Sequence, residues 1–154
     1  MKVILPGSYD PITLGHLDII KRAASLYSEV YAVVFINPDK KYIFSKEDRL
    51  EMLRLATEEI PNVKVDFSDG FVVDYMKKEG IGKIIKGYRN QTDYEYELLQ
   101  AEYNYKHGGF ETELWRAGEN MENISSTKAR EAIEKDEPLE KILPKKIISY
   151  INSH

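Results

Sequence analysis

Near its N-terminus the chain reads Val3-Ile4-Leu5-Pro6-Gly7-Ser8-Tyr9-Asp10-Pro11-Ile12-Thr13-Leu14-Gly15-His16. The apolar run at Val3 to Leu5 predicts a short strand that Pro6 and Gly7 bring to an end. Apolar residues then recur with helical spacing from Leu17 to Leu26. A strand, a glycine-containing loop and a helix in this order predict a unit whose helix N-terminus can bind an anion.

The rest of the chain repeats this alternation of strand and helix. Apolar and β-branched runs predict further strands at 30–36, 63–67, 83–86 and 111–116. Helical patterns follow at 45–59, 71–79, 91–106 and 125–135, and a last helical segment at 138–152 is broken at Pro144. Five strands that are each followed by a helix predict an α/β fold, namely a single-domain, doubly wound, Rossmann-like parallel five-stranded sheet with helices on both faces.

Composition agrees with one folded domain over residues 1–154. Hydrophobic residues make up 42% and charged residues 31%, which is ordinary for a globular protein. Acidic residues outnumber basic ones by 26 to 22, so the net charge of −4 disfavours nucleic acid as a partner. The lack of cysteine excludes disulfides, thiolate zinc sites and cysteine nucleophiles. No apolar run approaches the roughly 18 residues that span a membrane, and residues 1–7 are too short for a signal peptide, so we expect a cytoplasmic protein without a membrane partner.

The predicted fold also indicates where a ligand would bind. Ligands of doubly wound sheets lie beyond the carboxyl ends of the strands, which directs attention to the loops after Leu5, Ile36, Ile85 and Arg116. His16 falls on the first turn of the first helix, where its imidazole could donate a hydrogen bond to a phosphate. A plain Gly-Pro turn with a packed histidine is the alternative, and the strand-to-helix position favours phosphate binding.

Three segments carry a resemblance to a known family. The first segment, Gly7-Ser8-Tyr9-Asp10-Pro11 with Thr13-Leu14-Gly15-His16, resembles the signature of the nucleotidyltransferase superfamily. The threonine at position 13, in place of the first histidine of that signature, resembles the pattern of the phosphopantetheine adenylyltransferase family within it. Lys86 to Glu97 resembles that family's third-loop segment, and Ile124-Ser125-Ser126-Thr127 resembles its serine-rich element. The resemblance covers nearly the whole chain with the same order and spacing. It therefore implies a nucleotidyltransferase domain over residues 1–154.

The resemblance implies a reaction and its partners. Members of this family join 4′-phosphopantetheine to the AMP part of ATP, which gives dephospho-coenzyme A and pyrophosphate in coenzyme A synthesis. Mg²⁺ would accompany ATP, and we expect no metal ligand among the protein's side chains. The family also implies a homohexamer.

The resemblance also implies site residues. The catalytic residues would be His16, which would stabilise the transition state, with Lys40 and Arg89. The 4′-phosphopantetheine would be bound by Ser8, Lys40, Val72 and Lys86. ATP would be bound by Ser8, Tyr9, His16, Gly87, Tyr88, Arg89, Glu97, Met121, Glu122, Asn123, Ile124, Ser125, Ser126 and Thr127. At position 86 this chain has a lysine where the family usually has an arginine. The lysine keeps the positive charge and lacks the planar fork of a guanidinium.

Several alternatives stay open at this point. Lys41 could join Lys40 at a phosphate or remain a solvated charge. Asp93 and Glu95 are interpreted as charges at a helix N-terminus, because side chains two residues apart on a helix do not converge. The competing functions are another adenylyl- or cytidylyltransferase, for example for nicotinate mononucleotide, and a non-catalytic nucleotide sensor. The chain contains neither a P-loop motif nor a G-x-G-x-x-G motif, which argues against P-loop kinases and NAD enzymes.

Overall fold

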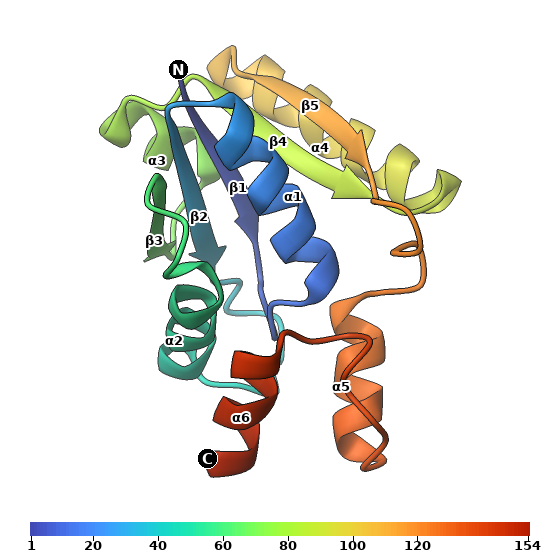
Figure 1. Cartoon of the computed structure of the whole chain (residues 1–154). Helices are drawn as coiled ribbons and strands as arrows, with labels where there is room; N and C mark the ends of the chain where they lie inside the picture. Colours follow the sequence, from blue (N-terminus) through green and yellow to red (C-terminus); the bar gives the residue numbers. More distant parts are fainter.

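Every strand pairing in the sheet is parallel. The computed structural model describes residues 1–154 and contains the strands β1 (Lys2–Gly7), β2 (Glu29–Phe35), β3 (Val63–Ser68), β4 (Lys83–Tyr88) and β5 (Glu111–Arg116). They lie in the order β3-β2-β1-β4-β5 (Figure 1). The predicted five-stranded parallel sheet is therefore confirmed. The chain winds outward from β1 in one direction and then crosses to its other side at β4, which creates a switch point between the carboxyl ends of these two strands.

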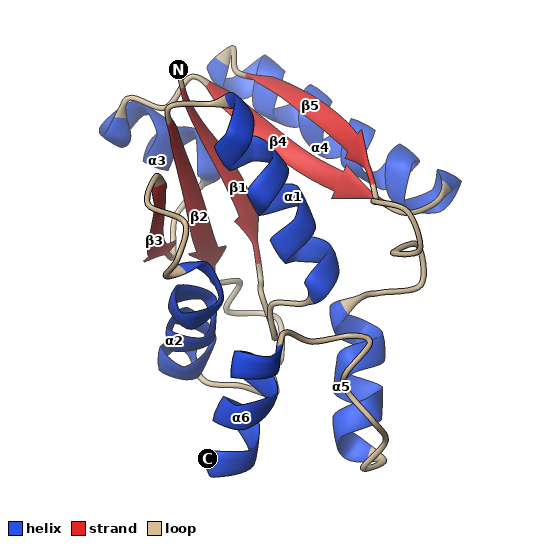
Figure 2. Cartoon of the chain, viewed as in Figure 1, coloured by secondary structure: helices blue, strands red, loops and turns tan.

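Helices cover both faces of this sheet. They are α1 (Leu14–Leu26), α2 (Lys46–Thr57), α3 (Val72–Glu79), α4 (Gln91–Gly108), α5 (Ser126–Glu134) and α6 (Lys145–Ser153). Figure 2 shows α1, α2 and α6 on one side of the strands and α3 and α4 on the other. None of them is long and apolar enough to cross a membrane.

The two layers of helices explain why β1 is apolar at consecutive positions. Val3 and Leu5 point into a core shared with Ile20 of α1, while Ile4 points into a second core with Met76 of α3. A strand that is buried on both faces needs an apolar residue at every position, because successive side chains alternate between the faces.

One predicted element is wrong in its first part. The helix expected over 138–152 begins only at Lys145, and residues 138–143 are not helical, with a turn at 140–142. A proline disfavours helical backbone at the preceding residue, so a helix cannot run through Pro144 without strain. The turn gains a contact instead, because the N–H of Leu14 donates to the carbonyl of Ile142 (2.8 Å) and thereby satisfies a free donor at the start of α1.

Candidate active site

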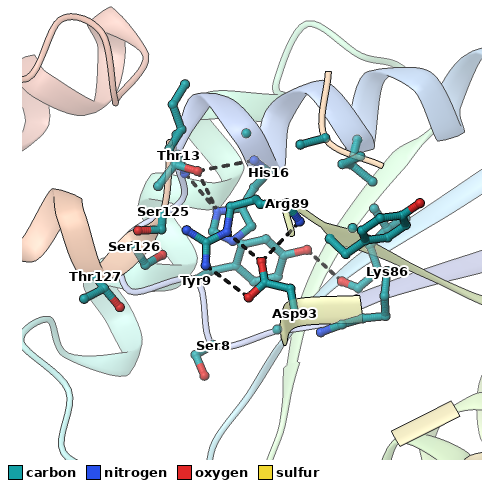
Figure 3. A pocket seen from close by; sticks show the side chains of 18 of the residues that line it. Ser8, Tyr9, Thr13, His16, Lys86, Arg89, Asp93, Ser125, Ser126 and Thr127 are labelled. Carbon is teal, nitrogen blue, oxygen red and sulfur yellow. Dashed lines mark hydrogen bonds and ion pairs between the residues drawn. The ribbon is translucent and has the colours of Figure 1, made fainter. Parts of the chain in front are cut away.

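A cavity of about 400 Å³ opens at the switch point. Its walls come from the loop after β1 and the start of α1, from Lys40 in the loop after β2, from β4 and the loop behind it, from Ala117 after β5, and from the start of α5 (Figure 3). The four loops predicted to carry the chemistry therefore do meet at one place. A parallel sheet brings them together because all its carboxyl ends lie at the same edge.

His16 is held by a reciprocal cap at the start of α1. The backbone N–H of Thr13 donates to His16 Nδ1 (3.0 Å), and the N–H of His16 donates to Thr13 Oγ1 (3.3 Å). Because Nδ1 accepts a hydrogen bond from the backbone, the neutral ring must carry its proton on Nε2. The local sequence thus fixes the tautomer and leaves an Nε2–H donor for a ligand in the cavity.

The surroundings keep this imidazole neutral. Burial of the ring, and then the positive charges of Lys86 and Arg89, lower the pKa of His16 to about 4. The side chain is therefore uncharged near neutral pH and acts there as a hydrogen-bond donor. The same charges that disfavour an imidazolium favour an anionic ligand in the cavity.

Tyr9 shapes the loop before α1. It is 4% exposed, and its hydroxyl donates to the carbonyl of Leu5 (2.8 Å). Its φ of 47° lies in the left-handed region, where a bulky residue is rare. The ring packs against that of His16, with 5.1 Å between their centroids. Buried contacts therefore hold the loop in a conformation that its sequence alone would not favour.

The loop after β2 is tied to the loop after β1. The carboxylate of Asp10 accepts hydrogen bonds from the backbone N–H groups of Ile43 (3.0 Å) and Phe44 (3.1 Å). At the other end of this loop, Lys40 Nζ lies 3.4 Å from Ser8 Oγ and contributes to the cavity wall. A hydroxyl and an ammonium group thus lie side by side, which suits the binding of one phosphate.

Lys86 faces the cavity, and a carboxylate is its partner. Lys86 Nζ lies 3.2 Å from the carbonyl oxygen of Pro6 and 3.6 Å from Glu97 Oε1. The side chain of Glu97 is 13% exposed, and its second oxygen, Oε2, is buried without a hydrogen bond. Burial therefore raises the pKa of Glu97, although the charge of Lys86 acts in the opposite direction. An anion that binds Lys86 will also lie near Glu97.

Arg89 is paired with Asp93. Its Nε donates to Asp93 Oδ2 (2.8 Å) and its Nη2 to Asp93 Oδ1 (3.2 Å), and the backbone N–H of Arg89 also donates to Oδ2 (3.1 Å). Asp93 is fixed in turn at the first turn of α4, where its N–H donates to Asn90 Oδ1 (2.9 Å). The guanidinium is therefore held by one edge, and its Nη1 group remains for a ligand.

The start of α5 gives its two serine hydroxyls different tasks. Ser125 is the N-cap and accepts a hydrogen bond from the N–H of Lys128 (3.1 Å). Ser126 Oγ donates to the carbonyl of Pro11 (2.8 Å), which joins α5 to the loop after β1. Only the first of them is a helix cap.

Arg130 completes this side of the cavity. Its Nη1 donates to the carbonyl of Asp10 (2.9 Å) and its Nη2 to Thr127 Oγ1 (3.1 Å). It adds a further positive charge to a wall that already contains Lys40, Lys86 and Arg89. The cavity lining thus contains four basic side chains and three acidic ones, Asp10, Asp93 and Glu97, within a chain of negative net charge.

Comparison with known proteins bears directly on this geometry. The cytidylyltransferase-like family matches residues 4–132. Proteins named phosphopantetheine adenylyltransferase are similar along nearly the whole chain. The one from Clostridium novyi is 43% identical over 96% of this chain and 92% of its own length. The one from Corynebacterium efficiens is 40% identical over 98% of this chain and 96% of its own length. The one from Symbiobacterium thermophilum is 43% identical over 94% of this chain and 90% of its own length. The chain belongs to the phosphopantetheine adenylyltransferase family.

Most positions predicted by resemblance to the phosphopantetheine adenylyltransferases line the cavity. These are Ser8, Tyr9, His16, Lys40, Lys86, Gly87, Tyr88, Arg89, Glu97, Met121, Ile124, Ser125, Ser126 and Thr127. Val72, Glu122 and Asn123 do not line it. Val72 begins α3 and packs beside the core on the other side of the sheet, and Glu122 and Asn123 are exposed. Ligand contacts of these three residues stay predictions.

The structure adds residues that the sequence reasoning did not assign. Asp10, Asp93 and Arg130 all line the cavity, whereas the exposed Lys41, left open above, does not. Arg89 lies just before the N-cap Asn90 of α4, and its guanidinium pairs with Asp93 in the first turn of this helix. Arg49 had no local sequence signal, since it reaches the loop after β1 from α2 through the fold (Nη1 to Ser8 O, 3.0 Å).

Proposed function

We propose that this chain transfers the adenylyl group of ATP to 4′-phosphopantetheine, which gives dephospho-coenzyme A and pyrophosphate. The observation that carries the proposal is the neutral His16, whose free Nε2–H faces a cavity walled by Lys40, Lys86 and Arg89. Such a cavity can hold two phosphate-bearing substrates and offer a donor between them. The names of the similar proteins support this choice of nucleotide and acceptor.

The chemistry requires positioning and charge stabilisation only. An oxygen of the acceptor's phosphate attacks the α-phosphorus of ATP, and the bond to the pyrophosphate oxygen breaks as the new bond forms. His16 donates its Nε2–H to an oxygen of the reacting α-phosphate and keeps its proton. Lys40 and Lys86 neutralise the attacking phosphate, and Arg89 binds the departing pyrophosphate through Nη1.

The remaining cavity residues orient the two substrates. Ser8 and the N–H of Tyr9 would bridge the acceptor's phosphate and the nucleotide. The segment from Met121 to Thr127 would hold ATP against the N-terminus of α5, where free N–H groups favour a negative charge. Glu97 and the backbone of residues 87–88 would contact the nucleotide from β4 and α4.

Magnesium would enter this site with ATP. No group of three or more histidine, aspartate or glutamate side chains is placed to hold a metal. Among the nearby carboxylates, Asp10 accepts from the N–H groups of Ile43 and Phe44, and Asp93 pairs with Arg89. Glu97 contacts Lys86 through Oε1. We therefore propose that the ATP phosphates and water hold Mg²⁺, where its charge would neutralise that of the phosphates.

We expect the purified protein to release pyrophosphate with ATP and 4′-phosphopantetheine, the acceptor that the names of the similar proteins indicate. Pyrophosphate release is measured with ATP and a panel of phosphorylated acceptors that includes nicotinate mononucleotide. A preference of at least about 100-fold in kcat/KM for 4′-phosphopantetheine is expected. A preference for nicotinate mononucleotide would assign the chain to a different transfer, and ATP binding without turnover of any acceptor would indicate a sensor.

We also propose a homohexamer in the cytoplasm. The helix α4 has no buried residue in the single chain, and Tyr96, Leu98, Leu99, Tyr103 and Tyr105 are exposed along it. Burial of such an apolar surface against a second copy of the chain stabilises an assembly. Light scattering after gel filtration should give about six times the chain mass of 17.9 kDa. A mass that stays at one chain over a range of concentrations contradicts the assembly. Both substrates are charged metabolites, which supports the cytoplasm as the compartment.

A further inference from the structure

Arg49 on α2 is a buried cation that the proposed mechanism does not use. It is 2% exposed and does not line the cavity. No carboxylate lies within ion-pair distance, and its Nε is buried without a hydrogen bond. Its guanidinium donates from Nη1 to the carbonyl of Ser8 at 3.0 Å and lies over the ring of Tyr42, with 3.8 Å between Cζ and the ring centroid. A buried charge without a counter-ion is costly, so this arrangement needs a reason.

Tyr42 connects Arg49 to the loop that carries Lys40. The hydroxyl of Tyr42 accepts a hydrogen bond from the N–H of Asn37 (2.9 Å), which spans the loop from one end to the other. The ring of Tyr42 lies with its centroid 5.7 Å from Lys40 Nζ. Residues 37–41 are all exposed, so they have little other packing to fix them. The stack of Tyr42 on the buried guanidinium therefore anchors this loop.

The contacts form a closed circuit around the acceptor side of the cavity. Arg49 holds the carbonyl of Ser8, and the hydroxyl of the same serine lies 3.4 Å from Lys40 Nζ. From Lys40 the circuit returns to Arg49 through Tyr42. One buried guanidinium thus sets both the position of Ser8 and that of the loop bearing Lys40.

We infer that Arg49 and Tyr42 are positioning residues that hold Lys40 and Ser8 at the spacing that binds the phosphate of the acceptor substrate. This inference rests on the proposed function. Neither residue lines the cavity, and both act through Lys40 and Ser8. Asp10 fixes the far end of the same loop through Ile43 and Phe44, so loss of the stack frees the part that carries Lys40 and leaves α2 in place. The Arg49 charge also lies beneath Ser8 and favours an anion there.

The Tyr42→Leu variant tests this positioning role. We expect its KM for 4′-phosphopantetheine to rise about 10-fold, because a mobile Lys40 must be ordered again when the phosphate binds. Its KM for ATP should change by less than about threefold, because the nucleotide side does not contain Tyr42. Tyr42→Phe keeps the ring over Arg49 and should recover most of the acceptor affinity. A Tyr42→Leu variant that only melts earlier, with both KM values unchanged, would overturn the inference.

A double-mutant cycle separates action through Lys40 from general damage. In a Lys40→Ala background, Tyr42→Leu should change the KM for 4′-phosphopantetheine by less than about twofold, because the group that it positions is gone. In a Lys41→Ala background, which removes the neighbouring exposed lysine, the full effect should persist. Independent effects that multiply in both backgrounds contradict the circuit.

Arg49→Lys tests the other end of the circuit. It keeps the charge and loses the planar face that stacks on Tyr42, so it should weaken acceptor binding in the same way. If this buried variant does not fold, the Tyr42 variants alone test the positioning role.

Turnover by the unsubstituted protein is measured first. No turnover there would refute the proposed function itself, whereas normal turnover with an unaffected Tyr42→Leu would refute only the positioning role.

Discussion

Replacing His16 by alanine should lower the rate of adenylyl transfer about 100- to 1000-fold, because the variant loses a pre-oriented donor to the reacting phosphate. ATP affinity should remain nearly intact, since Arg89 and the start of α5 are unchanged. Single-turnover pyrophosphate release gives the rate, and calorimetric titration gives the Kd for ATP. Turnover close to that of the unsubstituted protein in a folded variant would refute the role of His16.

Folding of the His16→Ala variant needs its own control, because His16 also accepts the N–H of Thr13 in the helix cap. Loss of such a cap costs about 0.5–2 kcal/mol of stability. A lower melting temperature is therefore expected even where the fold is intact. A loss of rate that persists well below this melting temperature belongs to catalysis.

The pKa of His16 gives the same residue a pH signature. Because this pKa is lowered to about 4, the ring stays neutral as the pH falls from 8 to 6, and no loss of rate over that range should come from His16. The unfolded chain, with an ordinary pKa of about 6.5, binds a proton first as the pH falls, so this group destabilises the fold progressively between about 6.5 and 4. A rate decrease near pH 6.5 that disappears in His16→Ala would contradict this.

Replacing Lys86 by alanine should raise the KM for 4′-phosphopantetheine about 10- to 100-fold, with a much smaller change in the KM for ATP. Loss of a charge-assisted hydrogen bond usually costs about 1.5–3 kcal/mol, which corresponds to one to two decades in affinity. The structure adds a reason, because Lys86 Nζ lies 3.6 Å from Glu97 Oε1 and its removal leaves this carboxylate facing the incoming anion. Steady-state kinetics with each substrate varied separately measures the effect.

The matched variant is Lys86→Arg, which restores the planar fork that is usual in the family. It should be tolerated or mildly improve binding, provided that the wall formed by Pro6 and Glu97 accommodates the larger group. The side chain of Lys86 lies in the cavity wall, where Nζ is 3.2 Å from the carbonyl oxygen of Pro6. An unchanged KM for 4′-phosphopantetheine in Lys86→Ala would refute its assignment to that substrate.

The secondary-structure elements and the position of His16 at the start of α1 follow from the amino-acid sequence. The spacing of apolar residues that distinguishes a strand from a helix is visible within a few residues of sequence. The five strands and most of the helices therefore follow from this local hydrophobic pattern. Thr13 and His16 are three residues apart, which is the spacing of a capping box, and the hydrogen bonds of this box hold the His16 ring through Nδ1. The four loops that line the cavity were predicted because ligands of parallel sheets bind beyond the carboxyl ends of the strands. The expected reaction came from the resemblance to a known family.

The ion pair of Lys86 and the contacts of Arg49 depend on how distant elements pack together. Lys86 of β4 faces Glu97 because α4 packs against β4. Arg49 of α2 reaches the carbonyl of Ser8 because β1, which precedes Ser8, pairs with β2. The lowered pKa of His16 likewise depends on burial and on cations that come from a different strand. Residues 138–143 likewise contact a distant element, because the carbonyl of Ile142 accepts a hydrogen bond from the N–H of Leu14. Hydrogen bonds between neighbours can be read along a chain, whereas electrostatic partners are fixed by which elements pack together.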